Sequence, residues 1–163
     1  MTKLKYISFI ICAALLFSSC EKDEEIDTQK PTINIDFANA FPKNCEVIYF
    51  DEPFSIRAVL SDNVQLGSFS IDIHNNFDHH THSTEFESCP LDDIKDPVNP
   101  YLIIEDFSIP EGLSEYETEV MLTIPSTDGT NLYDEGDYHF HLGVTDQEGW
   151  ASQIGLHIKI LHQ

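Results

Sequence analysis

The sequence predicts an all-β domain over residues 31–163, because apolar and polar residues alternate there in short runs. A period of two places one face of each strand in a core and the other face in solvent. No part of this range shows an apolar stripe with helical period. Hydrophobic residues make up 41% of the chain, with only 7 Gly and 8 Pro, which excludes a collagen-like or disordered protein.

The alternating runs give the expected strands in order along the chain. They cover residues 32–37, 54–60, 69–74, 120–124, 138–144 and 155–161. Pro, Gly, Asp and Asn separate the runs, and short strands divided by such turn residues are typical of an antiparallel sandwich. The closing run reaches the end of the sequence, so we expect one domain.

Two segments specify the kind of sandwich. The first, Asp134 to Phe140, has the D-x-G-x-Y spacing of an immunoglobulin-type corner, in which the Tyr138 hydroxyl bonds to upstream backbone. The second, residues 144–150, is similar to the hairpin that follows this corner in bacterial immunoglobulin-like domains. Phe140 stands where antibody domains carry a cysteine, so the antibody type is excluded. The sequence therefore predicts an immunoglobulin-like antiparallel β-sandwich of about seven to nine strands.

The first 19 residues are typical of a secretory signal. Lys3 and Lys5 precede a predominantly apolar run over 6–17. A helix of that length reaches only about 18 Å, whereas a hydrocarbon core is about 30 Å thick. The signal ends in Phe17-Ser18-Ser19-Cys20, which resembles a bacterial lipobox, so Cys20 is expected to carry a membrane-anchoring lipid. The alternative is a signal cleaved elsewhere, with Cys20 incidental.

Residues 20–30 are predicted to form a solvated acidic tether between the lipid and the domain. Lysine followed by acidic residues resembles the export signal of outward-facing lipoproteins in some Gram-negative groups. We therefore expect an outer-membrane lipoprotein at the cell surface, and a generic acidic tether is the alternative. The net charge of −21 excludes nucleic acid as a partner, because phosphates require a basic surface.

Cys45 and Cys89 are the cysteines that remain once Cys12 leaves with the signal and Cys20 takes the lipid. Outside the cytoplasm such a pair typically forms a disulfide. Closing so long a loop stabilises a fold by about 4 kcal/mol in the chain-entropy treatment. A pair of metal thiolates and two unpaired thiols are the alternatives. The connection over 85–100 is either an ordered flap or a loose loop.

Histidines gather in two of the alternating runs and in the segment that follows the first of them. In the run over 69–74 the isoleucines face the core, so Asp72 and His74 face outward. By the same alternation His139 and His141 face outward in their run. Neighbouring strands would bring these side chains together, with the following segment folded over their end. The predicted metal ligands are His74, His80, His82, His139 and His141, with Asp72, Asp78 and His157 as supporting or additional ligands.

Imidazole is the commonest metal ligand of proteins, and three or four rings within about 5 Å suit Zn²⁺ or Cu²⁺. The negative charge of the chain raises the local concentration of cations. The alternative is that the histidines are solvated polar residues in strands and a hydrophilic turn. Turn carboxylates such as Asp62, Asp128 and Asp146 are of the type that binds Ca²⁺, but a solvated acidic surface is the simpler interpretation.

A family resemblance rests on residues 73–83, which read IHNNFDHHTHS, and on the hairpin that comes later in the chain. With the lipoprotein signal, these features resemble the domain-of-unknown-function 4625 family. The likeness covers essentially the whole chain after the signal. It implies an immunoglobulin-like fold and an envelope location, and since that family is uncharacterised it implies no activity.

Catalytic signatures are absent from the sequence, which contains no G-x-S-x-G and no glycine-rich loop before a helix. We therefore predict a non-catalytic lipoprotein of the envelope that binds a divalent transition metal, Zn²⁺ or Cu²⁺, through its histidines. A catalytic zinc site is a lesser alternative. The main alternative is an interaction module that docks a protein or a glycan at the cell surface, with incidental histidines.

Overall fold

The computed structural model describes residues 26–82 and 89–163. The predicted signal, Cys20 and the first part of the tether lie outside these described residues. Within the two ranges the chain forms ten strands and no helix, so none of these residues belongs to a helix able to cross a membrane. The strands are β1 (Thr32–Asn34), β2 (Glu46–Tyr49), β3 (Pro53–Ile56), β4 (Val59–Ser61), β5 (Leu66–Asn75), β6 (Ile103–Ser108), β7 (Glu115–Glu117), β8 (Val120–Thr123), β9 (Gly136–Asp146) and β10 (Ala151–Leu161).

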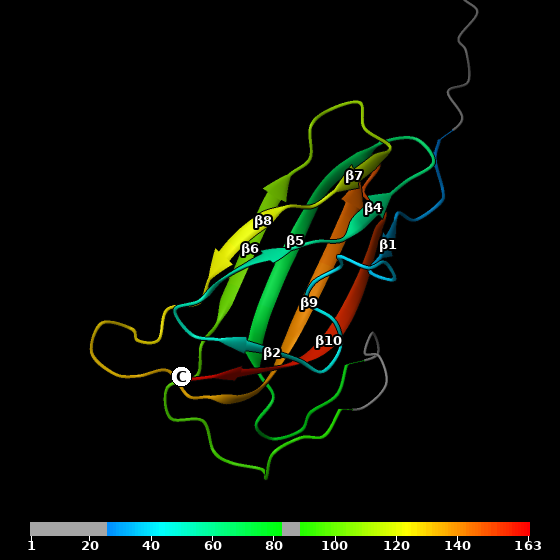
Figure 1. Cartoon of the computed structure of the whole chain (residues 1–163). Coiled ribbons are helices and arrows are strands. Elements are labelled where there is room, and N and C mark those ends of the chain that lie inside the picture. The colour runs from blue at the N-terminus through cyan, green and yellow to red at the C-terminus, as the bar shows by residue number, and fades with distance from the viewer. Residues whose placement is uncertain (1–25, 83–88) are drawn as a thin grey trace, which may run out of the picture.

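A five-stranded sheet carries the three longest strands side by side (Figure 1). Its order is β2-β10-β9-β5-β6, and every neighbouring pair is antiparallel except β2 with β10, which is parallel. The predicted runs over 69–74, 138–144 and 155–161 lie in β5, β9 and β10. The expectation that these runs are neighbours in one sheet is therefore confirmed.

The opposite layer consists of short strands in two hydrogen-bonded groups, β1-β4-β7 and β3-β8. The predicted strand over 54–60 is divided into β3 and β4. At the break, the Ala58 N–H donates to the Thr118 hydroxyl at 2.9 Å, and that hydroxyl donates to the Ile56 carbonyl at 3.1 Å. The described residues form ten strands where the sequence predicted seven to nine, because this run is divided and because β2, β6 and β7 lie outside the predicted runs.

The core lies between the two layers and is filled from the inward positions of the alternating runs. Ile71, Ile73, Phe140 and Leu142 of the main sheet are each at most 2% exposed. Leu60 from the opposite layer belongs to the same cluster. Full burial of one such side chain stabilises the fold by about 1.5–3 kcal/mol. The predicted all-β sandwich is confirmed.

The tyrosine corner forms as predicted. The Tyr138 hydroxyl donates to the Asp134 carbonyl at 2.5 Å and accepts the backbone N–H of Tyr101 at 3.2 Å. These bonds satisfy the polar atom of a side chain that is fully buried near the start of β9. The corner therefore holds the end of β9 from which His139 and His141 project.

The predicted disulfide joins Cys45, which precedes β2, to Cys89. Beyond Cys89 the connection is bonded to the main sheet. The Asp92 N–H donates to the Asp137 carboxylate at 2.7 Å, and the Asp92 carboxylate accepts from Lys159 at 2.7 Å. The described part of this connection is thus an ordered flap rather than a loose loop.

Candidate metal centre

Strand register places histidines of three adjacent strands in one row. His74 on β5 lies opposite His139 on β9, and His139 lies opposite His157 on β10. Two residues away along the strands, Asp72 lies opposite His141. Residues separated by two along a strand share a face, so all five side chains project from the same side of the sheet. We refer to His74, His139 and His157 as the histidine row.

The sequence predicts that this face is solvated, and that expectation is wrong for its centre. His139 is fully buried, and His141 and His157 are only 4% and 7% exposed. The segment 76–82, which follows β5 and carries the buried Phe77, contacts His139 through the His80 carbonyl and His141 through the ring of His82. Alternation could not show this burial, because it reports which face a side chain occupies and not what lies above that face.

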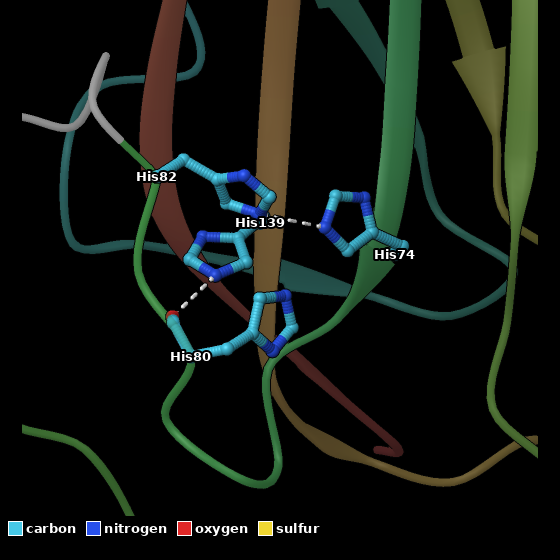
Figure 2. Close-up of side chains that lie close together, drawn as sticks. All are labelled: His74, His80, His82 and His139. Carbon is cyan, nitrogen blue, oxygen red and sulfur yellow. Dashed lines mark hydrogen bonds between the residues drawn. The ribbon is translucent and has the colours of Figure 1, made fainter.

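A tight turn brings two more histidines to the row. His79 has a φ of 58°, and its N–H donates to the Asn76 carbonyl at 3.2 Å, which reverses the chain. The carbonyl of His80 then accepts a hydrogen bond from Nε2 of His139 at 3.1 Å. Figure 2 shows that the rings of His80 and His82 reach from this segment toward the rings that project from the two strands.

Four imidazoles bring their ligand atoms together. One ring nitrogen from each of His74, His80, His82 and His139 lies within 4.8 Å of the others, and we term these four residues the histidine centre. The Nε2 atoms of His74 and His82 are 3.3 Å apart. Two nitrogens bound to tetrahedral Zn²⁺ at about 2.0–2.1 Å have about this separation. The centre therefore has the ligand type and number of a four-coordinate site, and His74 and His82 have the spacing of two of its ligands.

Two aspartates orient rings of the histidine centre. Nδ1 of His74 donates to Asp72 at 2.8 Å, and Nδ1 of His80 donates to Asp78 at 2.5 Å. A neutral imidazole that donates through Nδ1 carries its lone pair on Nε2, so Nε2 is the ligand atom in both residues. Carboxylate–histidine pairs of this kind usually support metal-bound imidazole. These contacts place Asp72 and Asp78 directly beside two of the predicted ligands.

The electrostatics of the centre favour neutral imidazole and ionised carboxylate. Burial lowers the pKa of His139 from 6.5 to about 3, and the nearby rings of His157, His74 and His80 act in the same direction. The hydrogen bond to the His80 carbonyl acts against these effects. The hydrogen bond from the His80 ring lowers the pKa of the Asp78 carboxyl. At neutral pH His139 is therefore neutral and offers a lone pair, and the Asp78 carboxylate is negatively charged; both features attract a cation.

The remaining predicted residues lie beside the histidine centre. His141 forms a second set of ligand atoms with Asp72 and His74, again within 4.8 Å of one another. The ring of His157 lies 5.1 Å from the ring of His139. The structure thus brings together every side chain that the sequence assigned to the metal site, with His141 and His157 at its border.

His79 and His162 are not among the predicted ligands, and both lie apart from the histidine centre and from the residues at its border. His79 forms the turn and belongs to neither set of ligand atoms. His162 stacks on Phe50, and its Nε2 donates to the Tyr133 carbonyl at 2.9 Å. His79 therefore serves the turn and His162 packs on Phe50, so neither supplies a ligand atom to the centre.

Sequence reasoning missed the support beneath His157. The side-chain oxygen of Asn44 accepts the His157 N–H at 2.9 Å, and the His157 carbonyl accepts the Cys45 N–H at 2.8 Å. The segment that carries the disulfide therefore holds the outer end of the histidine row. No pattern connects Asn44 with His157, because they are 113 residues apart in the chain.

The chain matches a protein family over residues 18–161, and that family is described as Domain of unknown function (DUF4625). The match includes all ten described strands and the whole histidine centre. No curated protein matches the chain. The family description assigns no activity to the histidine centre or to any other part of the chain.

Proposed function

We propose that this chain, which belongs to the DUF4625 family, is a non-catalytic envelope lipoprotein that binds one divalent transition-metal ion at its histidine centre. The observation that carries this proposal is the convergence of four imidazole nitrogens, from two strands and one turn, within 4.8 Å of one another. Four protein ligands fill a tetrahedral shell and leave no open position for a substrate. That arrangement favours binding over catalysis.

Zn²⁺ and Cu²⁺ are the ions that suit this ligand set. Imidazole binds both of them well, whereas Cu⁺ selects softer sulfur ligands. Among the described residues, Cys45 and Cys89 are bonded to each other, and Met121 is 67% exposed on a strand of the opposite layer. The described sulfur atoms therefore supply no ligand to the centre, which favours a divalent ion.

The location in this proposal rests on the sequence. A lipid on Cys20 would anchor the protein in the outer membrane, and the acidic residues that follow favour the cell surface. The partners are then the membrane, through the lipid, and the metal ion. A net charge of −21 supports cation capture, because it concentrates divalent ions near the protein.

Zinc binding by the full chain, purified in detergent without a histidine tag, tests the proposal. We expect elemental analysis to find one Zn²⁺ per chain and titration to be saturable. The variant His80→Ala/His82→Ala removes two ligands from the turn and leaves both strands unchanged. Its Zn²⁺ affinity should fall by more than about 100-fold, because losing only an outer partner of a ligand already costs about 10–100-fold.

His162→Ala is the matched control, because this histidine stacks on Phe50 outside the centre. It should bind Zn²⁺ like the native chain. A native chain without stoichiometric metal, or a double variant with unchanged affinity, would contradict the proposal and leave the protein- or glycan-interaction module as the function. Competition between Zn²⁺ and Cu²⁺ then identifies the preferred ion.

A further inference from the structure

Three carboxylates converge at the end of β5 that lies away from the histidine centre. Asp27 precedes β1, Asp62 lies between β4 and β5, and Asp146 is the last residue of β9. One oxygen from each lies within 4.8 Å of the others. Asp146 and Asp27 are only 4% and 7% exposed. The sequence predicts a solvated tether and a solvated acidic surface for these residues, and the structure corrects both expectations.

Each carboxylate uses one oxygen to accept hydrogen bonds from nearby N–H groups. Asp27 Oδ1 accepts from the Gln29 N–H and from Asn63 Nδ2. Asp62 Oδ2 accepts from the N–H groups of Val64 and Gln65. Asp146 Oδ1 accepts from the Trp150 N–H, and the five bonds are 2.7–3.0 Å long. These bonds hold all three side chains in fixed orientations. They also leave the second oxygen of each carboxylate available.

In all three carboxylates the second oxygen is buried and has no hydrogen-bond partner among residues 26–82 and 89–163. These oxygens are Asp27 Oδ2, Asp62 Oδ1 and Asp146 Oδ2. No Lys or Arg of the described residues forms an ion pair with them. Buried anions are costly unless a counter-charge or a metal ion compensates them. The Gln29 N–H and the Asn63 amide lower the pKa of Asp27, so this carboxyl stays ionised at neutral pH.

We propose that these three carboxylates bind a Ca²⁺ ion. The ligands are oxygen atoms only, which hard cations prefer. Two oxygens on opposite sides of an ion lie about 4.6–5.2 Å apart around Ca²⁺ and about 4.0–4.2 Å apart around Mg²⁺. Oxygens that lie within 4.8 Å of one another can therefore share one Ca²⁺ ion. Water and backbone carbonyls complete the shell of about 6–8 oxygens.

The ion joins parts of the chain that are far apart in sequence. Asp27 belongs to the segment between the predicted lipid anchor and the domain, whereas Asp62 and Asp146 belong to the sandwich. Trp150 already contacts that segment, because its indole Nε1 donates to the Asp27 carbonyl at 2.9 Å. Bound Ca²⁺ therefore fastens the segment that follows the anchor to the end of the sandwich.

Trp150 reports on this site, because it is the one tryptophan of the chain and it bonds to both Asp27 and Asp146. The full chain in detergent is freed of metal with EDTA, and CaCl₂ is then added while tryptophan emission and thermal unfolding are recorded. We expect a saturable change in emission at about 1 mM Ca²⁺ or below. At ten times the dissociation constant the folded-to-unfolded ratio should rise about 11-fold.

The variant Asp62→Asn/Asp146→Asn keeps the hydrogen-bond acceptors and removes two charges. Its Ca²⁺ affinity should fall at least about tenfold. The order of melting temperatures should also reverse: the variant melts above the native chain in EDTA, where repulsion is relieved, and below it in saturating CaCl₂. Asp128→Asn is the matched control, because exposed Asp128 accepts similar turn hydrogen bonds outside the cluster.

Three results would overturn the proposal: no response of emission or melting to Ca²⁺, an equal response to MgCl₂, or an unchanged Ca²⁺ response in the double asparagine variant. The variant His80→Ala/His82→Ala separates the two sites. It should retain the full Ca²⁺ response, since the carboxylates and the histidine centre share no ligand.

Discussion

At the scale of single residues, His139 combines the burial of a core side chain with the chemistry of a ligand. It is fully buried, and its Nε2 donates to the His80 carbonyl at 3.1 Å. A neutral ring that donates through Nε2 carries its lone pair on Nδ1. Because burial disfavours the protonated ring, the folded protein holds this imidazole in the form that a cation requires.

Metal-free protein should lose stability as the pH falls from about 6.5 toward 3. Burial lowers the pKa of His139 from 6.5 to about 3, so in this window the unfolded chain binds a proton that the folded chain does not. The free energy of unfolding therefore falls by up to about 1.4 kcal/mol per pH unit from this group alone. Urea unfolding in EDTA measures the effect, and His139→Gln should show a shallower pH dependence. Equal slopes in the two proteins would contradict the expectation.

At the scale of elements, the corner at the start of β9 is the feature to test. Tyr138→Phe removes the hydroxyl that bonds the Asp134 carbonyl and the Tyr101 N–H. Loss of these partners should lower the free energy of unfolding by about 1–3 kcal/mol, measured by urea titration. Tyr133→Phe is the control, because the hydrogen bonds of Tyr133 run through its backbone. A loss no larger than in the control would show that the corner does not hold β9.

The elements also show what the sequence can predict. Alternation gave the correct face for the histidines of β5, β9 and β10, because it depends only on local backbone geometry. The division of 54–60 was not predictable, since it depends on the distant residue Thr118. The sequence predicted that the segment after β5 folds over the strand ends, but not that it packs closely enough to bury His139 and His141. Burial of Asp27 was missed because a packed acidic segment and a solvated one have the same composition.

At the scale of the whole molecule, the proposed lipid on Cys20 is the feature to test. In the producing cell, the native chain should enter the outer-membrane fraction and incorporate labelled fatty acid, and Cys20→Ser should do neither. Cys12→Ser is the matched control, because this residue lies in the predicted signal and leaves with it. Native protein found free of membrane would contradict the anchor and leave the metal-binding proposal intact.

The length of β5 determines how far the histidine centre lies from the three carboxylates. Leu66 pairs with Asp146 beside the carboxylates, and His74 follows eight residues later, about 26 Å along the strand. The chain enters the domain at the carboxylate pole through Asp27. A molecule suspended from its N-terminus therefore holds its imidazoles at the opposite pole. If the proposed anchor is present, the length of the sandwich separates the histidine centre from the membrane surface.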